Sequence, residues 1–227
     1  IGSALCGQTA HNSKYSVKKG RIVFDTPKRA QGQQSMLGFA AEPIPVVRVG
    51  IIGLGMRGPG AVTRLGFIDN VEIRALCDLY PERIEENQRI LEKAGMPRAD
   101  AYSGEEGWKQ LCERDDLDLI YIVTPWLQHV PMAVYAMEHG KHVALEVPAA
   151  QSIAECWQLV DTSERTRRHC MMLENCVYDF FELTTLNMAQ QGLFGEIIHA
   201  QGGYVHYLEE YWPAFQGNWR LEFNERH

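Results

Sequence analysis

The chain has 227 residues, the length of one or two domains. Hydrophobic residues make up 45% and charged residues 22%, a globular composition that excludes a disordered or collagen-like chain. With 29 acidic and 22 basic residues the formal net charge is −7, and a surface of that sign repels nucleic-acid phosphates. No run approaches the roughly 18 consecutive apolar residues of a membrane-spanning helix. We therefore expect a globular protein with no nucleic-acid partner and no membrane span.

Residues 1–45 are polar, rich in Lys, Gln and Ser, and show no sustained period, so we expect an N-terminal arm there. The chain begins with Ile1 rather than Met, and residues 1–10 mix apolar and small residues as the end of a signal peptide does. A frayed polar arm explains the same residues equally well. The leader interpretation favours a periplasmic or secreted location over a cytoplasmic one.

Six cysteines are scattered along the chain without a C-x-x-C pair. Cys77 lies in an apolar, strand-like run, and we expect most of the six to be buried small hydrophobic residues rather than a disulfide framework. A zinc site needs paired ligands at short spacing, and the sequence offers none. We therefore expect no structural metal site.

From residue 46 onward, apolar runs alternate with amphipathic helical patterns. The expected strands are 46–52, 71–78, 117–123, 142–146 and 170–174. The expected helices are 61–65, 81–94, 104–114, 131–139, 152–168 and 178–191. A proline that opens a helix, two glycines that close helices and a Ser–Glu capping box mark their ends: Pro81, Gly140, Gly192, Ser152 and Glu155. This alternation predicts an α/β fold over residues 46–190, a Rossmann-type doubly wound parallel sheet with helices on both faces.

After residue 190 the pattern changes. Residues 196–206 alternate like one long strand of a different sheet, and an independent sheet needs about three strands. We therefore expect residues 191–227 to begin a mainly antiparallel α+β substrate domain that is incomplete in this chain. An uncovered strand of that sheet would offer an edge for a homo-oligomer.

A G-x-G-x-x-G motif lies between the first expected strand and the first expected helix, the context in which the motif carries meaning. Gly53 permits a tight turn, Gly55 lets the backbone approach a pyrophosphate, and Gly58 lets the helix pack close to the strand. The amides of Met56 and Arg57 would then point at phosphates from the helix N-terminus. The motif predicts a dinucleotide-binding loop, with a purely structural glycine turn as the alternative.

Asp78 ends the second expected strand, where such a fold places an acid. A carboxylate there accepts hydrogen bonds from both ribose hydroxyls and repels a 2′-phosphate, so the sequence predicts NAD rather than NADP. A strand-end aspartate with a structural role is the alternative. Together with Gly53 and Gly55, Asp78 favours the cofactor interpretation.

Polar stretches follow the third, fourth and fifth expected strands, at the sheet edge where a bound nicotinamide should lie. They read Thr-Pro-Trp-Leu-Gln-His at 124–129, Glu-Val-Pro at 146–148 and Glu-Asn-Cys-Val-Tyr at 174–178. In their order they resemble the Gfo/Idh/MocA oxidoreductases, whose strand ends carry a T/N-P-x-x-x-H stretch and an E-K-P motif. The resemblance covers about residues 46–227.

One departure narrows the resemblance: the lysine of E-K-P, which the family's dehydrogenases use beside the reacting alcohol, is Val147 here. A valine cannot shuttle a proton. Glu-Val-Pro-Ala-Ala at 146–150 is instead similar to the NAD-dependent α-N-acetylgalactosaminidases, glycoside hydrolase family 109. Three further stretches share that similarity: Thr-Pro-Trp at 124–126, Cys-Met-Met-Leu-Glu-Asn-Cys at 170–176 and Gly-Leu-Phe-Gly-Glu at 192–196.

The resemblance implies a glycosidase that removes terminal α-linked N-acetylgalactosamine from a small glycan or glycoside. Tightly bound NAD takes hydride from C3, a base removes the acidified C2 proton, the aglycone leaves, water adds, and the hydride returns. The residues that the resemblance places around NAD are Met56, Arg57, Asp78, Trp126, Leu127, Gln128, His129, Glu146, Val147 and Asn175.

The same resemblance places Tyr204 and Arg220 against the sugar. From side-chain chemistry, Tyr178 and His206 are candidate proton carriers, with a helix-face tyrosine and a sheet histidine as the alternatives. Trp126 also fits a core ring, and Arg220 a surface ion pair. Two rival functions remain open: an NAD-dependent sugar oxidoreductase of the same superfamily, and an inactive NAD-binding module.

Overall fold

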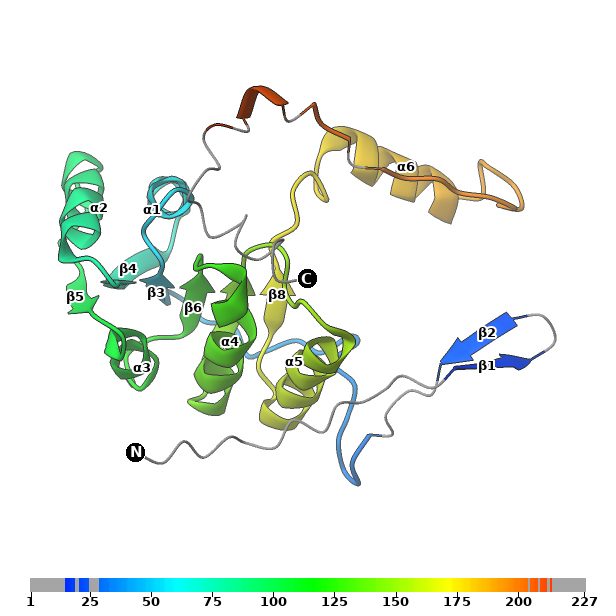
Figure 1. Cartoon of the computed structure of the whole chain (residues 1–227), viewed down its shortest axis with the longest axis horizontal. Helices are drawn as coiled ribbons and strands as arrows, with labels where there is room; N and C mark the ends of the chain where they lie inside the picture. The colour runs from blue at the N-terminus through cyan, green and yellow to red at the C-terminus, as the bar shows by residue number, and fades with distance from the viewer. Residues whose placement is uncertain are drawn as a thin grey trace. The chain divides into compact units, whose positions relative to one another are not determined.

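A computed structural model of the chain describes residues 15–18, 21–24, 29–203, 205–207, 209–211 and 213. Its contacts divide the chain into two units, Ile1–Leu173 and Glu174–His227 (Figure 1). The first unit holds a six-stranded sheet, and the second holds one longer helix. Tyr204 and Arg220 lie outside the described residues.

The sheet of the first unit is parallel throughout, in the order β5-β4-β3-β6-β7-β8 (Figure 1). Its strands are β3 (Val47–Ile52), β4 (Val71–Asp78), β5 (Asp100–Ser103), β6 (Leu119–Ile122), β7 (His142–Leu145) and β8 (Cys170–Met172). The chain starts at the centre with β3, builds outward to β5, and then returns to the other side of β3 with β6. This reversal creates a switch point at the carboxyl ends of β3 and β6, where such sheets bind ligands. The expected Rossmann-type doubly wound sheet is confirmed.

Helices cover both faces of the sheet because successive strand residues point to opposite sides. They are α1 (Gly58–Leu65), α2 (Pro81–Lys93), α3 (Gly107–Cys112), the 3-10 turn η1 (Trp126–Gln128), α4 (His129–Glu138) and α5 (Ile153–Thr166). Ile51 packs with Val62 of α1 and Ile84 of α2 in one buried cluster. Ile52, one residue later, packs with Ala133 of α4 in the other cluster. Two buried clusters therefore hold the sheet between its helices.

The helix ends follow the sequence signals, with one difference. α2 begins at Pro81, and Gly140 follows α4 with a φ of 79°. Ser152 Oγ accepts the Glu155 N–H at 3.2 Å, as a capping box requires. The Glu155 carboxylate, however, accepts the Gln151 N–H at 2.8 Å, one residue before the cap. The first half of the capping box is therefore present, whereas its second hydrogen bond is shifted by one residue, from the N–H of Ser152 to that of Gln151.

Two short elements escaped the sequence analysis. Residues expected to form an arm without a period contain an antiparallel hairpin, β1 (Tyr15–Lys18) paired with β2 (Arg21–Phe24). Its four-residue runs are too brief for a sustained alternation. The edge strand β5 is equally short and mostly exposed, so the apolar pattern that marks a buried strand is missing.

The second unit contains α6 (Phe180–Gln190), which the sequence predicted as helix 178–191, and the 3-10 turn η2 (Glu209–Tyr211). The expected strand over 196–206 is wrong for the residues that the structure describes there, 196–203, 205 and 206, because none of them belongs to a strand. A strand exists only through hydrogen bonds to a neighbour, and an alternating pattern supplies no partner.

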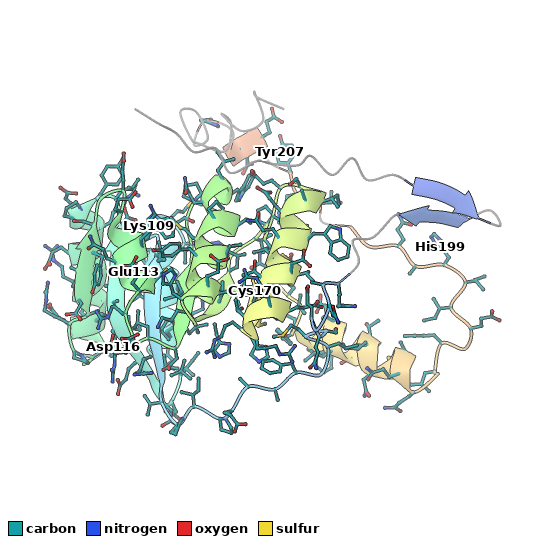
Figure 2. The ribbon with its side chains drawn as sticks, turned by 90° about the horizontal axis from the view of Figure 1, so that it is seen from below. Lys109, Glu113, Asp116, Cys170, His199 and Tyr207 are labelled. Atoms are coloured by element: carbon teal, nitrogen blue, oxygen red, sulfur yellow. The ribbon has the colours of Figure 1, made fainter. Side chains whose placement is uncertain are left out.

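The cysteine expectation is confirmed for part of the set. Among the five described cysteines, Cys77 and Cys112 are buried. Cys170, at the start of β8, is partly buried and packs against the buried cluster that contains Ile52 and Ala133 (Figure 2). Cys156 and Cys176 are exposed. No disulfide joins the described cysteines, and burial raises the pKa of the Cys77 and Cys112 thiols to about 12. The buried cysteines therefore behave as core residues rather than nucleophiles.

Candidate functional site

The glycine loop after β3 has a backbone that two of its glycines make possible. Gly53 has a φ of 97°, and a Cβ there would lie 2.7 Å from the carbonyl carbon and oxygen of Val123. A Cβ on Gly58 would lie 2.5 Å from the carbonyl oxygen of Gly53. Any larger residue must displace backbone at both positions. The loop is thereby pressed against the end of β6 on one side and the start of α1 on the other.

Gly55 serves a different purpose because its missing side chain leaves open space. A Cβ there would meet only the Arg83 guanidinium, 3.5 Å from Nη1. Met56 is 73% exposed, and Arg57, the N-cap residue of α1, makes no side-chain cap hydrogen bond to the first-turn amides. An uncovered loop beside uncapped helix amides suits a pyrophosphate. The loop therefore fits a dinucleotide.

Asp78 is fixed beside this loop. Its Oδ2 accepts the Leu54 N–H at 2.7 Å, and its Oδ1 accepts the Tyr80 N–H at 3.1 Å. The residue is 7% exposed. A carboxylate has about four acceptor positions, so these two backbone bonds leave room for the two hydroxyls of a ribose. The remaining contact, from Arg83 Nη1 at 3.4 Å, is long.

The four predicted residues after the carboxyl end of β6 differ in their exposure to solvent. Leu127 and Gln128 of η1 are exposed and Trp126 is partly buried. His129 is 1% exposed, with Nδ1 2.7 Å from the carbonyl oxygen of Pro148 and Nε2 2.8 Å from that of Thr124. The first three can face a ligand, whereas His129 joins the β6 end to the β7 end.

The β7 end presents Glu146 and Val147, both partly buried. The Tyr121 hydroxyl donates to Glu146 Oε1 at 3.0 Å. Burial raises the pKa of Tyr121, the Glu146 charge adds to the rise, and a hydrogen bond from Arg64 opposes it. Tyr121 therefore stays protonated as a donor and holds the Glu146 carboxylate in one orientation.

The remaining candidate site residues lie in the second unit, Glu174–His227, which is described separately from the first. Asn175 is exposed and its N–H donates to Glu174 Oε1 at 3.0 Å. Tyr178 is 66% exposed, and His206 is exposed. The structure therefore brings together the glycine loop, Asp78 and the ends of β6 and β7, whereas Asn175, Tyr178 and His206 remain separate candidates.

Two residues of this site, Arg83 and Tyr121, were not predicted from the sequence. Arg83 lies on the first turn of α2, five residues after Asp78, a spacing that turns its side chain back toward the strand end. Tyr121 precedes the strand end by one residue, and its neighbour in register is Ala144, two residues before Glu146. Strand alternation puts Tyr121 and Glu146 on one face, a signal that appears only once the β6–β7 register is known.

Among the described residues, no helix is both long enough and apolar enough to cross a membrane. Within the same residues, His, Cys, Asp and Glu side chains form no group of three that could hold a metal ion.

Comparison with known proteins gives a family match over the sheet. The family model described as GFO_IDH_MocA, an oxidoreductase family with an NAD-binding Rossmann fold, matches residues 47–174. Two solved structures share the fold at 19% identity. One is the WlbA dehydrogenase of Chromobacterium violaceum with NADH and UDP-GlcNAcA, with a TM-score of 0.59 over 69% of this chain and 44% of that one. The other is scyllo-inositol dehydrogenase of Lactobacillus casei with NAD(H) and scyllo-inositol, with a TM-score of 0.58 over 67% and 43%.

Curated relatives are much more similar in sequence. A protein of Porphyromonas gingivalis named glycosyl hydrolase family 109 protein is 58% identical over 100% of this chain and 49% of its own length. A protein of Bacteroides fragilis named alpha-N-acetylgalactosaminidase is 53% identical over 88% of this chain and 48% of its own length. The chain spans about half the length of the curated relatives it matches.

Proposed function

Since the chain belongs to the Gfo/Idh/MocA family of oxidoreductases with an NAD-binding Rossmann fold, we propose that it uses NAD in a redox-neutral glycosidase reaction. The proposed substrate is a glycan or glycoside with terminal α-linked N-acetylgalactosamine. Support comes from the names of relatives at 53–58% identity. It comes also from one feature of the site, the valine at the end of β7.

The geometry of the first unit supports the following proposed placement of the cofactor. We assign the pyrophosphate to the loop at Gly55 and the amides of Met56 and Arg57, because among the described residues a Cβ on Gly55 would meet the Arg83 guanidinium alone and Arg57 makes no side-chain cap. We assign the adenosine ribose to Asp78, whose carboxylate is fixed by two backbone amides. The nicotinamide would then reach the ends of β6 and β7, near Glu146.

Val147 is the observation that carries the reaction type. It follows Glu146 at the carboxyl end of β7, the position of the lysine that the family's dehydrogenases use. Its isopropyl group neither donates nor accepts a proton, so it cannot assist an alcohol that is oxidised for release as a ketone. An enzyme that returns the hydride to the sugar within each turnover releases no ketone. Over the whole turnover it therefore has no net alcohol proton to remove.

The proposed reaction needs proton transfers that side chains can perform. When bound, NAD supplies a reversible acceptor for the hydride at C3 of the sugar. The C2 proton beside the resulting ketone is acidic, so a base removes it as the C1–oxygen bond of the aglycone breaks. Water then adds across the C1–C2 double bond, with its oxygen on C1 and a proton on C2, and the C3 ketone regains both the hydride and the hydroxyl proton that it lost on oxidation. Tyr178 and His206 are our candidates for these transfers.

The test uses the complete gene product and a nitrophenyl α-N-acetylgalactosaminide in heavy water. We expect nitrophenol without added NAD, deuterium at C2 of the released sugar, and retention of a deuterium label at C3. Nitrophenol release with no deuterium at C2 would exclude the elimination. Stoichiometric NADH with free sugars would show a sugar oxidoreductase instead, and NAD binding without turnover would show an inactive module.

A further inference from the structure

Arg83 lies beside the carboxylate to which we assign the adenosine ribose. Its Nη1 is 3.4 Å from Asp78 Oδ1, and its guanidinium carbon is 4.7 Å from the centre of the Tyr80 ring. The same Nη1 is 3.5 Å from the point where a Cβ on Gly55 would lie. The guanidinium therefore stands between the ribose carboxylate, the Tyr80 ring and the open side of the glycine loop.

The ion pair between Arg83 and Asp78 is loose, and neither side chain depends on it. The Asp78 carboxylate is held by the Leu54 and Tyr80 amides at 2.7 and 3.1 Å, whether or not Arg83 is present. The Arg83 side chain is 46% exposed although Asp78 is buried, and a contact of 3.4 Å is longer than an ordinary charge-assisted hydrogen bond. Arg83 can therefore turn toward a bound nucleotide at small cost.

An acid and a base at this position have opposite consequences for the cofactor. An acid at the end of the second strand binds the free 2′-hydroxyl of NAD, whereas a nearby arginine accommodates the 2′-phosphate of NADP. This chain carries both groups. Asp78 is held in place by two backbone hydrogen bonds, whereas its contact with Arg83 is long. The balance between them sets how strongly a 2′-phosphate is rejected.

We propose that Arg83 is a specificity-determining residue that forms a latent 2′-phosphate site, which the charge of Asp78 suppresses. The inference rests on the ribose placement given under the proposed function. Without the Asp78 charge, the Arg83 guanidinium gains a phosphate as its partner. A charge-assisted hydrogen bond of this kind raises affinity about tenfold to a hundredfold.

The test compares two probes that differ only in the 2′-phosphate, 5′-AMP and adenosine 2′,5′-bisphosphate, by calorimetric titration. Asp78→Asn removes the charge and retains an oxygen to accept the Leu54 N–H. We expect this variant to bind the bisphosphate at least about tenfold more tightly, relative to 5′-AMP, than the unchanged protein. We expect the gain to disappear when Arg83→Gln is added. Arg89→Gln, on the exposed side of the same helix, is the matched control and should leave the ratio unchanged.

Two outcomes would overturn the inference. One is a gain that persists in the variant carrying both Asp78→Asn and Arg83→Gln. The other is an Asp78→Asn variant whose ratio of bisphosphate to 5′-AMP affinity equals that of the unchanged protein. In the Asp78→Asn variant, the further change Arg83→Lys keeps the positive charge and should retain most of the gain in bisphosphate affinity. This result separates a charge effect from a folding defect. If the unchanged protein binds neither 5′-AMP nor NAD, the ribose placement itself fails and the inference with it.

Discussion

His129 Nδ1 lies 2.7 Å from the carbonyl oxygen of Pro148, a contact that joins the end of β6 to the end of β7. On the other side of the ring, Nε2 lies 2.8 Å from the carbonyl oxygen of Thr124. The residues that the site offers to a nicotinamide flank these two carbonyls. His129 is therefore a positioning residue: it acts on the site through the two backbone segments that it connects.

Replacing His129 with leucine should destabilise the protein and weaken NAD binding together. The substitution keeps side-chain volume but removes the buried imidazole, so at least one of the two carbonyl oxygens beside it loses its donor, which costs about 1–3 kcal/mol. Urea unfolding and NAD titration measure the two effects. His139→Leu is the control, because His139 contacts one carbonyl on an exposed helix end. Full NAD affinity in the His129 variant would contradict the positioning role.

Alanine at position 53 should be far more damaging than alanine at other left-handed glycines. Gly95 has a φ of 73° with nothing within 4 Å of its added Cβ, so alanine there costs only the left-handed strain, about 1–2 kcal/mol. At Gly53 the Cβ also meets the Val123 carbonyl at 2.7 Å, and the loop must move. Thermal melts and NAD titrations of both variants test this. Equal losses would show that the close approach to β6 does not matter.

Removing the Arg29 side chain should lower the melting temperature more than removing Arg165, although both arginines pair with glutamates. Arg29 Nε lies 2.8 Å from Glu164, whose side chain is 3% exposed, so Arg29→Ala leaves a buried carboxylate poorly compensated. Arg165 pairs at 2.7 Å with Glu138, which is 43% exposed, and such surface pairs contribute little. We expect a fall of several degrees for Arg29→Ala and almost none for Arg165→Ala.

Stability should fall as the pH rises above about 9, partly through Cys77. Burial raises the pKa of this thiol from 9.0 to about 12 in the folded protein. Below pH 9 both states are protonated and the contribution is constant. Between pH 9 and 12 only the unfolded chain ionises, so unfolding is favoured progressively. Cys77→Ala should flatten the decline measured by urea titration at each pH, whereas Cys156→Ala, at an exposed position, should leave it unchanged.

The sequence determined the elements whose signals are local. The expected strand 71–78 matches β4, the helix 81–94 differs from α2 by one residue, and the G-x-G-x-x-G loop lies between β3 and α1. Apolar period, a first-turn proline and glycine spacing are properties of neighbouring residues, so they can be recognised without the fold. The candidate dinucleotide site could be proposed from the sequence for the same reason, because its loop and its acid follow two consecutive strands.

Only the tertiary structure decided which distant residues meet. Arg29 and Glu164 are 135 residues apart, and His129 contacts Pro148 across two strand ends. The partnership of Tyr121 with Glu146 depends on the β6–β7 register, and residues 196–206 alternate like a strand that the described residues do not form. Such outcomes depend on which segments pair, and pairing is a property of the whole chain. An alternating pattern specifies the faces of a strand but not its neighbour, and the neighbour supplies the hydrogen bonds.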